Sequence, residues 1–154
     1  DGTTGEVLAI DLISVKLRTF DNVLVRVPNE TMLKSKVLNL TRFPIRRVDL
    51  ILGVAYKEDV GRMREILLDV AEKNEKCFAD PEPVLFFTGY GDSALEFQFS
   101  VWGTTKNFID LKNEMYEQVK VAFDRAGIEI PFPHVSLYAG SVTEPFPVRT
   151  VPAR

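Results

Sequence analysis

Few residues in this sequence have side chains that could act in catalysis or bind a metal. The first candidate is the histidine. His134 is the single histidine and could carry a proton, but a general base normally needs an orienting partner and an enclosing pocket. It stands between Pro133 and Val135 in a linker, so we interpret it as a loop or interface residue. One histidine per chain cannot build a histidine-based metal cluster within a subunit, and we predict no metal and no cofactor.

The single cysteine is the next candidate. Cys77 could be a nucleophile if its neighbour Lys76 lowered the pKa of the thiol. Since no histidine accompanies it locally, we interpret Cys77 as a partly buried small side chain just past a helix. A single cysteine also excludes an intrachain disulfide and agrees with a reducing compartment. The chain is therefore predicted not to be an enzyme.

A basic and aromatic cluster is the strongest competing signal. Arg42, Arg46 and Arg47 surround Phe43, and next to a small β module they could bind single-stranded nucleic acid, as Sm-like or OB-like modules do. The whole chain carries 19 basic and 22 acidic residues, which gives no strong attraction for nucleic acid. Because these arginines can equally pair with acids of a neighbouring module, we expect no nucleic acid and keep such binding as the alternative.

The first elements that must position these residues are short strands. Asp21-Asn22 suits a tight hairpin because both residue types tolerate positive φ. Apolar and polar residues alternate with the period of two that a half-buried antiparallel sheet requires. This pattern predicts a small all-β module over residues 1–45, with strands over Glu6–Asp11, Ser14–Phe20, Val23–Val27 and Val37–Thr41.

From residue 46 the pattern includes helices. Asp59 is a plausible N-cap for a helix to about Asn74, and a second helix over about 107–126 ends at Gly127. The predicted strands are Val48–Tyr56, the hairpin of Val84–Thr88 with Leu95–Trp102, and a last strand over Val135–Ala139. This split βαβ order predicts an α+β chain with a ferredoxin-like α/β sandwich module over residues 46–130.

The remaining segment and the charge distribution support this division. Residues 131–154 are predicted to form a linker, the short C-terminal strand and an extended tail. The first 47 residues hold eight basic and five acidic side chains, whereas the rest of the chain is acidic. No stretch approaches the roughly 18 consecutive apolar residues that span a bilayer.

Six stretches, in order across about residues 5–139, are similar to one known family. They are Gly5-Glu6-Val7, the turn Leu17–Asn22, Val27-Pro28-Asn29, Asn39-Leu40-Thr41-Arg42, Gly53-Val54-Ala55-Tyr56 and the linker Ala126–Pro133. Together they resemble the soluble part of the MscS-like small-conductance mechanosensitive channels. The motif residues carried over by this resemblance are Gly5, Pro28, Asn29, Asn39, Arg42, Gly53, Gly127, Pro131, Phe132 and Pro133.

The resemblance implies a role in an assembly. The first module would be an Sm-like β-barrel forming a ring, and the second would form the wall of a hollow cytoplasmic cage. The copies would form a homoheptamer, joined in a closing barrel by an assembly strand that consists of Val135, Ser136, Leu137 and Tyr138.

The same resemblance implies how the whole protein would work. Pore and membrane helices would precede the Gly-x-Val strand, which places the full-length protein in the inner membrane and this part in the cytoplasm. Openings in the side of the cage would pass ions and small solutes during osmotic stress. The arm after Gly140 has no counterpart in the family pattern.

Overall fold

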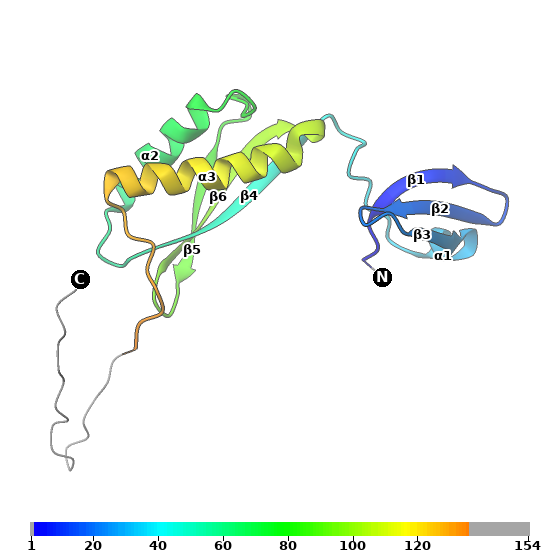
Figure 1. Cartoon of the computed structure of the whole chain (residues 1–154), viewed down its shortest axis with the longest axis horizontal. Coiled ribbons are helices and arrows are strands. Elements are labelled where there is room, and N and C mark those ends of the chain that lie inside the picture. The colour runs from blue at the N-terminus through cyan, green and yellow to red at the C-terminus, as the bar shows by residue number, and fades with distance from the viewer. Residues whose placement is uncertain (1, 136–154) are drawn as a thin grey trace, which may run out of the picture. The chain divides into compact units, whose positions relative to one another are not determined.

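The structure, a computed structural model, describes residues 2–135 (Figure 1). Contacts between residues divide the chain into two units. Unit 1 comprises Asp1–Arg42 and unit 2 comprises Phe43–Arg154. Each unit has its own antiparallel sheet, which confirms the α+β class.

Unit 1 is a three-stranded antiparallel sheet followed by a short helix. Its strands β1 (Gly5–Ile10), β2 (Ser14–Thr19) and β3 (Leu24–Pro28) lie in the order β1-β2-β3, and α1 spans Asn29–Lys34. Asn22 adopts φ 64° in the turn between β2 and β3, as predicted for a tight hairpin. The Thr19 carbonyl accepts a hydrogen bond from the Asn22 N–H at 3.0 Å, which closes this turn.

The predicted strand over Val37–Thr41 was wrong, because these residues form bends and extended chain without a ladder. The Asn39 side chain accepts a hydrogen bond from the Thr41 N–H at 3.1 Å, and such local bonds compete with strand pairing. Without a fourth strand, the described residues form an open sheet and do not close the Sm-like barrel that the resemblance implied.

Unit 2 places two helices on one face of a second antiparallel sheet (Figure 1). Its elements are β4 (Ile45–Val54), α2 (Val60–Lys73), β5 (Val84–Tyr90), β6 (Leu95–Thr104), the 3-10 turn η1 (Thr105–Asn107) and α3 (Phe108–Ala126). The strand order is β4-β6-β5, with β6 paired to both neighbours. This is the split βαβ arrangement without its last strand, because that predicted strand lies outside the described residues apart from Val135.

The ends of both helices follow local chemistry that the sequence predicted. Asp59 caps α2, since its carboxylate accepts a hydrogen bond from the Arg62 N–H at 2.7 Å. Gly127 follows α3 at φ 70°, a left-handed conformation that glycine adopts without strain.

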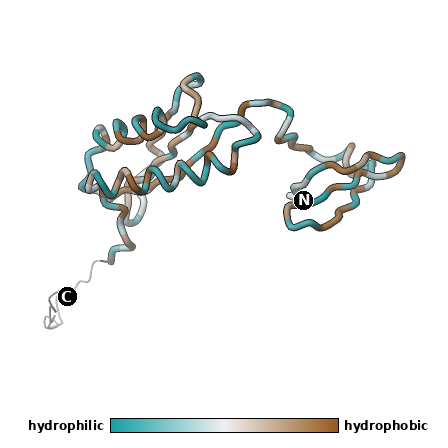
Figure 2. Tube along the Cα trace, turned by 45° about the horizontal axis from the view of Figure 1, so that its top comes forward, coloured by the Kyte–Doolittle hydropathy of each residue, from teal (hydrophilic) through white to brown (hydrophobic). Residues whose placement is uncertain are grey.

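The core of unit 2 lies between the sheet and the helices. Alternating residues of β4 and β6 face the helices, and the apolar stripes of α2 and α3 pack against them. Brown and teal alternate along both helices in Figure 2. Phe123 of α3 is also buried here. The largest fully buried side chains include Phe97, Phe99, Phe123, Leu50, Met63, Leu67, Leu111 and Met115.

Candidate assembly surface

Unit 1 carries an apolar sheet face with little packed against it. The strand register aligns Val7, Leu17 and Val25 across the sheet, and aligns Val15 with Ile10 and Val27. Within residues 2–42, only Ser14 and Val15 are buried. The side chain of Ile10 is 75% exposed. A contiguous apolar surface of this kind is typical of an interaction site.

The turn between β1 and β2 extends this apolar surface. Leu12 is 95% exposed at its tip, and Ile13 beside it is also exposed. The Asn29 amide donates to the carbonyl oxygens of Asp11 and Leu12 at 3.0 and 2.9 Å, and the Asn29 backbone N–H donates to Ile13 at 3.0 Å. The Pro28-Asn29 motif therefore ends β3 and bonds the start of α1 to the apolar turn.

The glycines of the family motif have local steric roles. A Cβ atom at Gly5 would lie 2.5 Å from the Arg18 carbonyl oxygen, so only glycine fits in β1 at this point. At Gly53 a Cβ atom would lie 3.2 Å from the Ala94 side chain, which makes this contact between β4 and the β5–β6 turn tight. These two glycines allow close approach to the neighbouring strand and turn.

The basic cluster is largely engaged within its own chain. The Arg46 guanidinium carbon lies 3.8 Å from the centre of the Phe108 ring, a cation–π contact. Arg47 binds Asp49 through Nε at 2.8 Å and Nη2 at 3.1 Å. Arg42 is exposed but belongs to the other unit. Since two of the three arginines already have partners, nothing favours the nucleic-acid alternative.

Asp49 also anchors a hydrogen-bonded row on the sheet face opposite the helices. The Ser100 hydroxyl donates to the Asp49 carboxylate at 2.7 Å, and the Gln98 amide donates to Ser100 at 3.0 Å. Burial of Asp49 opposes its ionisation, but the bonds from Ser100 and Arg47 outweigh it and lower the pKa of the carboxyl. Exposed Ile51 and Phe86 lie beside this row, so this face is a second uncovered surface.

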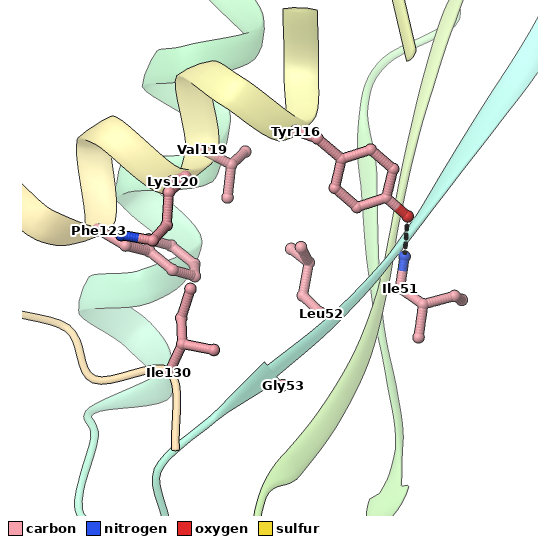
Figure 3. A pocket seen from close by; sticks show the side chains of 8 residues that line it. All are labelled: Ile51, Leu52, Gly53, Tyr116, Val119, Lys120, Phe123 and Ile130. Atoms are coloured by element: carbon pink, nitrogen blue, oxygen red, sulfur yellow. Dashed lines mark hydrogen bonds between the residues drawn. The ribbon is translucent and has the colours of Figure 1, made fainter. Parts of the chain in front are cut away.

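A groove of about 220 Å³ lies between α3 and the free edge of β4 (Figure 3). The Tyr116 phenol accepts a hydrogen bond from the Ile51 N–H at 3.3 Å and so occupies one donor of that edge. Lys120 is the charged residue of the lining, and its ammonium pairs with Asp124 at 2.6 Å. The lining residues are Ile51, Leu52, Gly53, Tyr116, Val119, Lys120, Phe123 and Ile130. This apolar lining is typical of a packing groove and not of a catalytic pocket.

The two candidate chemical residues lie apart. Burial raises the pKa of the Cys77 thiol, and the neighbouring Lys76 ammonium bonds to Glu114. His134 is exposed, and its backbone N–H donates to Ser93 Oγ at 3.0 Å. Both positions agree with the structural interpretation of these residues.

The predicted assembly strand cannot be followed in the structure. Val135 is exposed and is not part of a strand, and Ser136, Leu137 and Tyr138 lie outside the described residues. Pro131, Phe132 and Pro133 precede it in an irregular linker. Over residues 2–135, the structure holds no helix long and apolar enough to cross a membrane.

Comparison with known proteins gives a consistent match over both units. The family described as "Mechanosensitive ion channel MscS, C-terminal" matches residues 48–130, and "Mechanosensitive ion channel, beta-domain" matches residues 1–42. An uncharacterised MscS family protein of Archaeoglobus fulgidus is 32% identical over 86% of this chain and 47% of its own length.

Two further proteins extend this similarity. The small-conductance mechanosensitive channel of Edwardsiella ictaluri is 31% identical over 89% of this chain and 48% of its own length. The crystal structure of Helicobacter pylori MscS in its closed state matches with a TM-score of 0.86 at 27% identity, covering 92% of this chain and 56% of that one. The chain spans about half the length of the curated relatives it matches.

Proposed function

The chain belongs to the MscS family of mechanosensitive ion channels, and from that premise we propose that it forms the cytoplasmic cage of such a channel. In this proposal the chain assembles copies into a ring and filters the ions and small solutes that pass during osmotic stress. The apolar sheet face of unit 1 is the observation that carries the proposal. A face that includes Val7, Ile10 and Val25 requires a partner, and identical copies are the partner that a ring supplies.

Ring closure also explains the open edges of the unit 1 sheet. Among residues 2–135, strands β1 and β3 each have one edge without a partner strand, which in a single chain invites uncontrolled pairing. A closed homo-oligomer covers such edges with neighbouring copies. We propose a heptamer, in which the predicted strand over Val135–Ala139 contributes a closing barrel.

Filtering follows from the position of a cage wall in the path of the solutes. The first 47 residues carry excess positive charge, whereas the remainder is acidic. Ions that crossed such a wall would meet both signs of charge. The gate and tension sensor would lie in membrane helices upstream, within a longer protein in the inner membrane.

Light scattering on the purified chain at several concentrations tests the assembly. We expect a mass of about seven chains for the native sequence and a large loss of that mass for Ile10→Asp, because a carboxylate would be buried in the interface. The matched control is Ile109→Asp, which changes an exposed isoleucine of α3 in unit 2. This control should keep the native mass.

The same substitutions in the longer channel protein give the decisive result. If Ile10→Asp left both the assembled mass and the tension-activated current of that protein unchanged, the unit 1 face would not be an assembly surface. Loss of assembly with Ile10→Asp alone would support the proposal.

A further inference from the structure

Three exposed aromatic rings gather near the β5–β6 turn of unit 2. The rings of Tyr56 and Tyr90 stack at 6.4 Å between centres with planes 13° apart. The Phe87 ring meets Tyr90 edge-on at 5.0 Å. All three side chains are exposed, and Tyr90 is 78% exposed. We call Tyr56, Phe87 and Tyr90 the aromatic cluster.

The aromatic cluster contacts both the core and the backbone of unit 2. Phe87 packs edge-on against the fully buried Phe97 at 4.9 Å. The Tyr56 hydroxyl donates to the Gly91 carbonyl at 2.5 Å, which joins the loop after β4 to the β5–β6 turn. Fixed aromatic surfaces of this kind bind proline-rich segments, because an extended polyproline helix has little entropy to lose.

Acidic side chains border the aromatic cluster. Asp92 is exposed in the turn itself, and Glu96 is exposed at the start of β6. The Glu96 carboxylate lies close to Gly91, since a Cβ atom at this glycine would be 2.5 Å from its Oε1. The nearest basic residue in sequence, Lys57, already pairs with Glu129 at 2.5 Å. The surface therefore favours a segment that combines prolines with positive charge.

The C-terminal part of this chain has that composition. Residues 144–154 contain the prolines Pro145, Pro147 and Pro152, with the arginines Arg149 and Arg154 and one acid, Glu144. The described residues that precede this segment lie near the cluster, because the His134 N–H donates to Ser93 Oγ in the same turn. From there, the ten residues 136–145 can span up to about 33 Å when extended.

We propose that residues 144–154 bind the aromatic cluster of their own chain as an extended proline-rich segment. Pro145 and Pro147 would pack on the rings, and Arg149 would lie near Asp92 and Glu96. The proposal does not depend on the channel function, since it uses only contacts within unit 2 and the composition of the tail.

Fluorine NMR of the full chain labelled with 3-fluorotyrosine tests the contact. The chain has four tyrosines, so Tyr116 on α3 serves as an internal reference away from the turn. Replacing Pro145 and Pro147 by serine should move the signals of Tyr56 and Tyr90 and leave the signal of Tyr116 in place. Unchanged Tyr56 and Tyr90 signals would overturn the proposal.

Trypsin cleavage after Arg149 provides a second, independent measurement. Tyr90→Ala should raise the cleavage rate several-fold, because the released segment is open to the protease. The matched control is Phe86→Ala, which removes an exposed ring from the opposite face of the same strand. Circular dichroism of both variants checks that α2 and α3 remain folded, and equal cleavage rates in both would overturn the proposal.

Dilution distinguishes binding of the segment to its own chain from binding to a second copy. The tyrosine signals and the cleavage rate should be independent of concentration over a tenfold range. A protection that fades on dilution would overturn the proposal as stated and assign the segment to a neighbouring copy.

Discussion

In unit 2, the apolar residues of β4 and β6 face two long helices, whereas residues 2–42 of unit 1 contain only the six-residue helix α1, and Val7 and Ile10 of the unit 1 sheet remain exposed. Both sheets show the same alternation in sequence. In unit 2 the apolar side chains form a core in which Phe97 and Phe99 are fully buried. In unit 1 most apolar side chains remain in contact with solvent.

An alternating pattern therefore indicates a face that must be buried, but it does not indicate which molecule buries that face. The helices of unit 2 remove apolar surface from water, and each Å² so buried stabilises the folded chain by about 25 cal/mol. Unit 1 lacks such a cover among residues 2–42, so we expect its stability to depend on assembly.

The largest test compares equivalent truncations in the two units. Phe97→Ala should cost about 3–5 kcal/mol in the free energy of unfolding of unit 2, because it leaves a cavity in a packed core. Phe20→Ala in unit 1 removes a ring that is 82% exposed and should change stability by at most about 0.5 kcal/mol in the unassembled chain. Hydrogen exchange at the amides of β6 and β2 measures each unit separately.

One outcome would contradict the expected difference between the two units. If Phe20→Ala weakened the protection of β2 in the unassembled chain as strongly as Phe97→Ala weakens β6, unit 1 would have a core of its own. The assembly interpretation of its exposed face would then lose its physical basis.

A second test asks how far unit 2 depends on one backbone conformation. Gly127→Ala should destabilise unit 2 by about 1–2 kcal/mol, because the residue sits at φ 70° and a β-carbon strains the left-handed region. Its Cβ would meet nothing within 4 Å, so the cost comes from the backbone alone. Urea unfolding followed by fluorescence of Trp102, the single tryptophan, measures it.

Two further variants serve as controls for Gly127→Ala. Gly89→Ala, which has equally open space but no positive φ, should stay within about 0.5 kcal/mol. In unit 1, Asn22→Gly relieves the one positive-φ residue of its hairpin and should not weaken the protection of β2. A neutral Gly127→Ala would show that the end of α3 can rearrange without cost.

A smaller effect concerns the pH dependence of the stability of unit 2. The hydrogen bonds from Ser100 and Arg47 lower the pKa of Asp49 in the folded state despite its burial. Asp49 therefore stabilises unit 2 above its ordinary pKa of 3.8, and this contribution is lost as the pH falls through the lower, folded value. In the Asp49→Asn variant, the free energy of unfolding of unit 2, measured with urea, should fall less steeply with decreasing pH than in the native chain.

A surface carboxyl provides the control for this pH effect. Glu117→Gln changes an exposed residue of α3 and should follow the native pH dependence. Carboxylates titrate between roughly pH 5 and pH 2. If Asp49→Asn and the native chain lost the same free energy of unfolding over this range, the Asp49 hydrogen bonds would not contribute to stability.

Much of the fold could be predicted from local residue patterns. The Asp59 cap, the Gly127 terminus, the turn at Asn22 and the alternation in β6 depend on neighbours within a few residues, so their physics is already present in the sequence. The strand predicted over Val37–Thr41 failed for a related reason. Its apolar residues suit a strand, but no ladder partner is available and the Asn39 side chain bonds locally to Thr41.

Contacts between residues far apart in the chain could not be predicted from the sequence. Asp49 and Ser100 are 51 positions apart, and their bond exists because β4 pairs with β6 in one register. Arg46 stacks on Phe108, and Tyr56 reaches Gly91, for the same reason. A sequence determines which residues prefer a strand, a helix or a turn, whereas partners across a sheet depend on how the whole chain closes around its core, which no local pattern contains.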